Sequence, residues 1–235
     1  MIELWGSSTP NVQKVLLALE ELETPYEMIY VNLLNHEVTS PKFATLTHNR
    51  KVPLIVDPDG PGGEPVTVWE SGAILFYLAE KFGRFFPRDG AGRYRVMQWL
   101  MFQMSGIGPM FGQHIHFTRY APEETYSSAR YTTEVKRLYD VVERRLSESP
   151  YLAGDDYTIA DIATWPVIHQ IEMRGVGARE IPNVVRWIEQ IAKRPAVARL
   201  HKAVAEIPRP DVNELLQEQP DVMDRYFGRG RYSRA

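Results

Sequence analysis

The sequence contains no cysteine among its 235 residues. A chain without a thiol can form no disulfide, cannot bind zinc through cysteine and has no cysteine nucleophile. Any sulfur chemistry that this protein performs must therefore use sulfur atoms of its substrates. The formal net charge is also small, at −3, with 27 Lys and Arg against 30 Asp and Glu. A balance so close to neutrality gives no field that would attract nucleic acid or acidic lipid, so we expect neither partner.

Long apolar runs are absent as well, and none approaches the ~20 residues that span a bilayer. Met1 leads directly into a short apolar strand pattern, without the basic and apolar segments of a signal peptide. We therefore expect a cytoplasmic protein with no membrane contact. Hydrophobic residues make up 44% and charged residues 24%, as in ordinary globular domains. The length suffices for one large domain or two smaller ones.

The first eighty residues alternate between strand and helix patterns. β-rich segments occupy 2–5, 26–33, 51–57 and 64–69, and helical periodicity occupies 10–22 and 70–82, with a looser helical pattern at 40–49. Dense turn chemistry between the last two strand segments predicts a hairpin. This order predicts a small sheet with helices on its faces, an α/β domain.

The second half has helical periodicity throughout and no convincing strand, so we predict an all-α domain there. The four residues from Thr158 to Asp161 form a capping-box pattern before an apolar run. The C-terminal residues lose periodicity, which indicates an extended or partly disordered tail. We place the boundaries at 1–83 for the first domain, 84–93 for a linker, 94–207 for the helical domain and 208–235 for a C-terminal extension.

Three short motifs, in this order, resemble those of the glutathione transferases. Lys51-Val52-Pro53 resembles the strand whose cis-proline presents backbone groups to the cysteinyl part of glutathione. Glu70-Ser71 resembles the pair that holds the γ-glutamyl end, and Thr158–Asp161 resembles the capping box of the second domain. Each motif has a purely structural interpretation too: an edge-strand proline for Pro53, and a helix cap for Glu70-Ser71.

Within that superfamily, residues 9–11 (TPN), 70–81 and 108–117 most resemble the bacterial Nu class. The resemblance implies a thioredoxin-like first domain, a homodimer, and glutathione as cosubstrate, with two molecules or one glutathione disulfide in each site. It also implies that Thr9 and Asn11 act catalytically where other classes use Tyr, Ser or Cys. The alternative is that Thr9 only caps the helix that Pro10 begins.

The contacts to the glutathione carboxylates are less completely matched. Many Nu-like chains place a polar residue in the loop after the second strand, and the spacing puts Val38 there. We expect His36 or Lys51 to meet the glycine carboxylate instead. The resemblance implies that Arg130, near the start of a long helix, binds a glutathione carboxylate; a solvated helix face is the alternative.

The stretch from Phe111 to Tyr120 is rich in aromatic and histidine residues. His114 and His116 are two residues apart, so they face different sides of a helix, and no nearby carboxylate is suitably spaced. We therefore expect no metal. Phe111, His114, Phe117 and Tyr120 are predicted to line an electrophile pocket between the domains, although packing in the helical core would also explain them.

These observations favour a glutathione-dependent enzyme of Nu type. It would use the glutathione thiolate to reduce disulfides or to attack a hydrophobic electrophile, as a transferase, a peroxidase or an aryl-ether-cleaving enzyme. A lyase or isomerase that uses glutathione as cofactor is a further possibility. The alternative from another class is a non-catalytic glutathione-binding or interaction module, because one fold can serve several functions.

Overall fold

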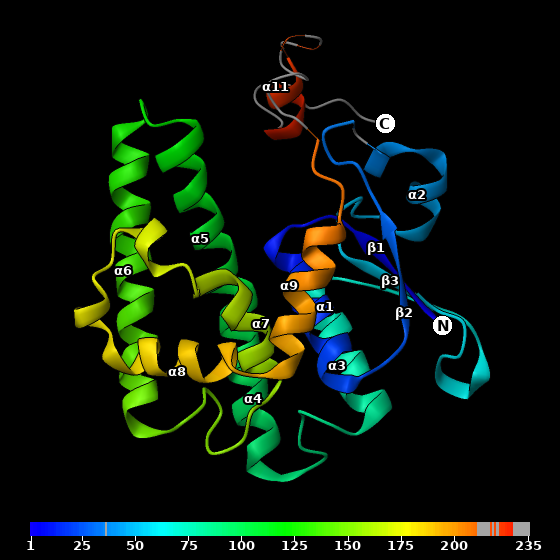
Figure 1. Cartoon of the computed structure of the whole chain (residues 1–235), viewed down its shortest axis with the longest axis horizontal. Coiled ribbons are helices and arrows are strands. Elements are labelled where there is room, and N and C mark those ends of the chain that lie inside the picture. Colours follow the sequence, from blue (N-terminus) through cyan, green and yellow to red (C-terminus); the bar gives the residue numbers. More distant parts are fainter. Residues whose placement is uncertain (36, 211–216, 218, 220, 228–235) are drawn as a thin grey trace.

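The computed structural model describes residues 1–35, 37–210, 217, 219 and 221–227. A sheet domain and a helical domain pack side by side (Figure 1). The sheet domain comprises β1 (Ile2–Gly6), α1 (Pro10–Leu22), β2 (Tyr26–Tyr30), η1 (Glu37–Thr39), α2 (Pro41–Leu46), β3 (Leu54–Asp57), η2 (Pro61–Gly63), β4 (Val66–Trp69) and α3 (Ser71–Phe82). The predicted strands and helices are therefore confirmed, including the short helix within 40–49.

The four strands form one mixed sheet in the order β2-β1-β3-β4. β1 and β2 are parallel, whereas β3 is antiparallel to both β1 and β4. Strand alternation sends neighbouring side chains to opposite faces. Leu4 of β1 joins the main core with α1 and α3, while the adjacent Trp5 packs with Phe43 of α2 on the other face. This is the thioredoxin-like arrangement that the family resemblance implied.

The second domain is helical. It contains α4 (Gly90–Phe102), the π-helical η3 (Gln103–Ile107), α5 (Gly108–Ile115), the π-helical η4 (His116–Tyr120), α6 (Thr125–Glu148), α7 (Ile159–Ile168), η5 (Ile171–Arg174), η6 (Ala178–Glu180), α8 (Pro182–Ala192), α9 (Pro195–Glu206) and α11 (Val222–Phe227). No strand occurs among its described residues apart from an isolated bridge between Tyr151 and Gly154.

Two predictions about the ends of this domain need correction. Helix α4 begins at Gly90, inside the predicted linker, because glycine is tolerated in a first turn whose N–H groups need no intrahelical partner. The predicted extended tail contains the short helix α11. Its Val222 is fully buried and its Phe227 ring lies 4.8 Å from that of His116, so tertiary contacts order this helix.

The capping box is present at the start of α7, as predicted. The carboxylate of Asp161 is fully buried and accepts hydrogen bonds from the N–H groups of Leu152 and Thr158, both at 3.0 Å. It also accepts a bond of 2.9 Å from the Trp187 indole on α8. One side chain thus joins the loop before α7, the first turn of α7 and α8.

We expect Asp161→Ala to destabilise the protein by about 3 kcal/mol or more, because several buried donors lose their acceptor at once. Urea denaturation of the variant measures this change. Asp156→Ala, at an exposed position in the same loop, is the matched control and should change stability little. A loss below about 1 kcal/mol for Asp161→Ala would contradict the role of this carboxylate.

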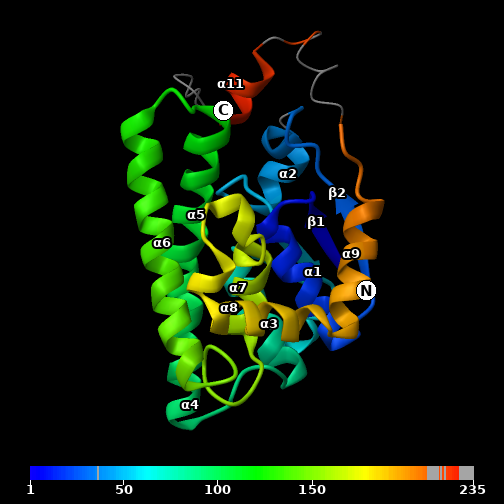
Figure 2. The ribbon, with the colours of Figure 1, turned by 60° about the vertical axis from the view of Figure 1, so that its left-hand side comes forward.

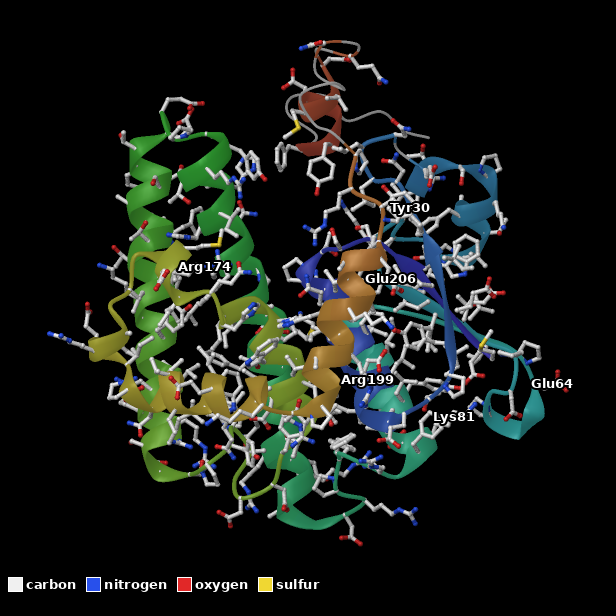
Figure 3. All side chains as sticks on the ribbon, in the orientation of Figure 1. Tyr30, Glu64, Lys81, Arg174, Arg199 and Glu206 are labelled. Atoms are coloured by element: carbon white, nitrogen blue, oxygen red, sulfur yellow. The ribbon has the colours of Figure 1, made fainter. Side chains whose placement is uncertain are left out.

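Helix α1 connects the two domains, and Figures 1 and 2 both show it between the strands and α7. Arg194, the N-cap residue of α9, pairs with Glu21 of α1 at 2.5 Å, and Arg199 of α9 pairs with Glu20 at 2.8 Å. Figure 3 shows Arg199 beside α1. These ion pairs lie at the edge of an apolar contact, so they fix the orientation of α9 more than they add stability.

Lys14 is the buried cation of this interface. Its side chain is 1% exposed, and its Nζ donates to the Oε1 of Gln103 in η3 at 3.0 Å. Burial lowers the pKa of Lys14 to about 7, and the carboxylate of Glu70 opposes part of that shift. The unfolded chain therefore holds this proton up to a higher pH than the native protein does, so the contribution of Lys14 to stability rises from about pH 7 toward pH 10.

We expect Lys14→Met to increase stability more at pH 6 than at pH 9, with a difference of about 2 kcal/mol. Urea denaturation of the wild type and the variant at both pH values gives this number. Lys136→Met, on the exposed face of α6, serves as the control and should give equal changes at both pH values. A Lys14→Met effect that does not depend on pH would refute the lowered pKa.

Candidate functional site

Two pockets share a lining residue in the first turn of α1. The first has a volume of about 180 Å³, and we call it the polar pocket. It is lined by Asn11, Asn49, Lys51, Val52, Pro53, Trp69, Glu70 and Ser71. The second, the apolar pocket, has a volume of about 340 Å³. It is lined by Pro10, Asn11, Gly108, Phe111, Gly112, Ile115, His116, Tyr120, Val167, Arg174, Tyr226 and Phe227. Asn11 lines both.

The polar pocket brings together residues that are far apart in the sequence. Lys51, Val52 and Pro53 precede β3, and the peptide bond between Val52 and Pro53 is cis, as the resemblance implied. The hairpin of β3 and β4 then returns the chain so that Glu70 and Ser71 lie beside this segment. Asn49, which the sequence analysis did not identify, donates from Nδ2 to the Oε1 of Glu70 at 3.1 Å.

Glu70 has an unusual backbone conformation, with φ at +73°. A residue other than glycine in this region is strained, and such strain is concentrated at functional sites. The side chain of Glu70 is exposed, so its carboxylate can meet a cation in the pocket. Ser71 is the first residue of α3, where unpaired N–H groups and the helix dipole favour an anion. Together they present a carboxylate and an anion site side by side, which suits an α-amino acid zwitterion.

The remaining residues discussed as glutathione contacts lie in different parts of the structure, and not all of them line the polar pocket. Lys51 supplies a cation to the polar pocket. Val38 packs against the apolar cluster around Trp5, as an apolar residue at that position should. His36 lies outside the described residues. Arg130 lies on the exposed face of α6 and lines neither pocket.

The start of α1 has the predicted shape. Thr9 occupies the N-cap position, yet its side chain makes no capping hydrogen bond, and it lines neither pocket. Pro10 is the first helical residue, and Asn11 follows in the first turn with its side chain exposed. Asn11 is therefore the polar side chain at the junction of the two pockets, next to unpaired helix N–H groups.

The apolar pocket contains only part of the aromatic set predicted for it. Phe111 and Tyr120 line it, but His114 and Phe117 do not. His114 faces the core at 3% exposure, and burial lowers its pKa. Phe117 stacks on Tyr131 of α6, with ring centroids 5.4 Å apart.

His116 takes the place that we predicted for His114. The two positions lie on different sides of the helix, and only the packing of α5 against α6 decides which side faces the pocket. Further lining residues that were not predicted include Arg174, Tyr226 and Phe227. The aromatic pair Tyr226-Phe227 in the tail was a usable signal, whereas Arg174 had none in the sequence pattern.

No group of three or more His, Asp or Glu among the described residues could hold a metal ion. Over the same residues, no helix is both long and apolar enough to cross a membrane.

Comparison with known proteins agrees with this architecture. The family "Glutathione S-transferase, N-terminal domain" matches residues 9–81, and "Glutathione S-transferase, C-terminal domain" matches residues 103–195. The disulfide-bond oxidoreductase YfcG of Escherichia coli is 43% identical over 201 residues, covering 85% of this chain and 94% of YfcG.

Solved structures give the same result. A glutathione transferase family member from Pseudomonas fluorescens, with two glutathione bound, superimposes with a TM-score of 0.81 at 41% identity, over 88% of this chain and 93% of that one. A glutathione transferase from Pseudomonas putida, with one glutathione disulfide bound per subunit, gives 0.79 at 42%, over 86% and 90%. The chain therefore belongs to the glutathione transferase family, and its similarity to YfcG places it near the disulfide-bond oxidoreductases of that family.

Proposed function

We propose that this protein is a glutathione-dependent disulfide-bond oxidoreductase. Glutathione binds in the polar pocket, and the disulfide substrate or a second glutathione binds in the apolar pocket. The observation that supports this most directly is that Asn11 lines both pockets. A sulfur atom beside Asn11 would face a substrate in the apolar pocket without leaving the polar one. Homodimerisation and a cytoplasmic location, which the family resemblance implies, belong to the same proposal.

The polar pocket matches glutathione group by group. The γ-glutamyl carboxylate suits the N-terminus of α3 at Ser71, and the ammonium group suits the Glu70 carboxylate that Asn49 orients. The backbone beside the cis Pro53 suits the cysteinyl part. Lys51 suits the glycine carboxylate. In this orientation the thiol points toward the start of α1.

The reaction needs no thiol from the protein. One glutathione thiolate attacks a sulfur of the substrate disulfide, forms a mixed disulfide and releases the first substrate thiolate. A second glutathione thiolate then attacks the glutathione sulfur of the mixed disulfide, which yields glutathione disulfide and the second substrate thiolate. The two glutathiones supply both electrons. The protein binds and orients the reactants and holds the attacking sulfur as a thiolate.

Asn11 and the free amides of α1 favour that thiolate. An unperturbed thiol has a pKa of ~8.5, and a hydrogen bond to a charged acceptor contributes about 1.5–3 kcal/mol. The helix dipole adds roughly 0.3–1 kcal/mol. These contributions together correspond to a decrease of one to three pKa units, at ~1.36 kcal/mol per unit. The thiolate would then predominate near neutral pH.

A second candidate activity is attack of the same thiolate on a hydrophobic electrophile. Phe111, Ile115, Val167, Tyr226 and Phe227 give the second pocket a largely apolar lining, which favours such a substrate. Parallel assays with bis(2-hydroxyethyl) disulfide, 1-chloro-2,4-dinitrobenzene and cumene hydroperoxide separate the activities. Glutathione binding without turnover of any of them would instead support a non-catalytic binding module.

We expect Glu70→Ala and Ser71→Ala each to weaken glutathione binding ~10- to 150-fold, since each removes a partner of a charged group worth about 1.5–3 kcal/mol. Titration calorimetry measures the affinity. Glu64→Ala, on the β3–β4 hairpin remote from the pockets (Figure 3), is the control and should bind normally. Unchanged affinity in both test variants would place glutathione elsewhere. A thermal melt of each variant distinguishes a loss of binding from a loss of stability at the start of α3, because only the latter lowers the melting temperature.

We expect Asn11→Ala to raise the apparent pKa of turnover by about one unit, because it removes the side-chain donor at the junction of the two pockets. The catalytic role that the family resemblance implies for Thr9, which lines neither pocket, predicts a similar rise for Thr9→Val. The pH dependence of kcat/KM with bis(2-hydroxyethyl) disulfide gives this pKa. Thr9→Ser keeps the hydroxyl and should behave as the wild type. If neither Asn11→Ala nor Thr9→Val shifts the profile, the backbone amides of α1 must activate the thiol without these side chains.

A further inference from the structure

The apolar pocket contains a buried cation that the proposed reaction does not use. Arg174, the last residue of η5, lines this pocket together with Asn11, Phe111 and Val167. Its side chain is only 4% exposed. Figure 3 shows it in the helical domain, between η5 and α5. Burial of a guanidinium in such a position is costly unless a counter-ion or hydrogen-bond acceptors compensate its charge.

The contacts of Arg174 are all neutral. Nη1 donates to the backbone oxygen of Phe111 at 3.1 Å, and Nη2 donates to that of Val167 at 3.3 Å. The guanidinium carbon also lies 5.0 Å from the centre of the Phe111 ring. The Nε–H is buried and has no partner among the described residues.

No carboxylate balances this charge within the part of the chain that the structure describes. Arg174 takes part in no salt bridge there, and the described residues that line the apolar pocket include no Asp or Glu. The titratable groups that interact with it electrostatically are His114, Tyr139 and His169. Burial lowers the pKa of Arg174, but a guanidinium keeps its proton at any physiological pH.

Two backbone carbonyls accept hydrogen bonds from the guanidinium, but they do not neutralise its charge. Burial of an uncompensated charge is costly, and a neutral side chain of similar length could also bridge α5 and α7. An anion in the adjoining pocket would remove this cost on binding, and a guanidinium is the side chain best suited to hold a carboxylate.

We propose that Arg174 selects carboxylate-bearing substrates for the apolar pocket, namely disulfides or electrophiles with an anionic group a few atoms from the reacting centre. This inference rests on the proposed function, in which the apolar pocket holds the partner of the glutathione thiolate. The chemistry is unchanged, and two glutathiones still reduce one disulfide. Arg174 is a specificity-determining residue that takes no part in bond breaking.

Three symmetric disulfides of nearly equal size test the proposal. They are 3,3′-dithiodipropionate, bis(2-hydroxyethyl) disulfide and cystamine, whose arms end in a carboxylate, a hydroxyl and an ammonium group. Because thiolates attack charged disulfides at different intrinsic rates, each enzymatic kcat/KM is divided by the uncatalysed rate constant. We expect the wild type to favour the anionic disulfide over the neutral one about tenfold, and the cationic one least.

Arg174→Gln should abolish this preference, measured as the ratio of the normalised kcat/KM values for the anionic and the neutral disulfide. Arg174→Lys keeps the charge and should keep part of the preference. Arg179→Gln, at an exposed site five residues further on, removes the same charge and should change nothing. A wild type without anion preference would overturn the proposal. So would an Arg174→Gln variant that loses all three activities equally, because that pattern indicates a structural role.

A binding measurement separates this proposal from the oxidoreductase activity on which it rests. Calorimetry with S-(3-carboxypropyl)glutathione and S-butylglutathione compares a carboxylate with an apolar group in the same pocket. We expect the wild type, relative to Arg174→Gln, to bind the carboxylate ligand about tenfold more tightly and S-butylglutathione equally. If no disulfide is reduced but this difference appears, the oxidoreductase activity fails and the anion selectivity stands. Equal affinities for the carboxylate ligand in the two proteins would refute it.

Discussion

The burial of α1 between the two domains is the constraint on which the rest of the structure depends. Val12, Val15, Leu16 and Leu19 are completely buried, and so is Leu17, which lies outside that stripe. The helix contacts the sheet and α3 on one side and α7 and α9 of the helical domain on the other. Apolar residues on more than one face of the helix can be buried only inside a larger core, so the two domains hold α1 jointly. Only its N-terminal turn, with Pro10 and Asn11, reaches the pockets.

This arrangement explains why the site lies at a boundary between domains. The sheet domain provides the polar pocket through the segment before β3 and the start of α3, and the helical domain provides most of the apolar pocket. The start of α1 is the structural element common to both. In the proposed reaction, glutathione and its partner would meet at this boundary.

Few charged side chains lie around the site, and each has a different environment. Glu70 is exposed at a strained backbone position, where an incoming ammonium group can replace water. Lys14 is buried beneath the site and is hydrogen-bonded to Gln103, so its charge depends on pH. Arg174 is buried against aromatic and backbone groups and keeps its charge. Without any cysteine, such electrostatic groups are the means by which this chain can influence a sulfur reaction.

The sequence by itself determined the elements and, through the family resemblance, the lining of the polar pocket except Asn49 and Trp69, because those signals are local. Pro10 and Thr158 define helix starts through backbone chemistry, and Lys51-Val52-Pro53 and Glu70-Ser71 are short motifs at the ends of predicted strands and helices. The residues that line the apolar pocket could be identified only from the tertiary structure. The choice of His116 over His114 depends on how α5 packs, and Arg174 and Phe227 come from distant segments. Such side chains meet through packing between helices, which leaves no local pattern in the sequence.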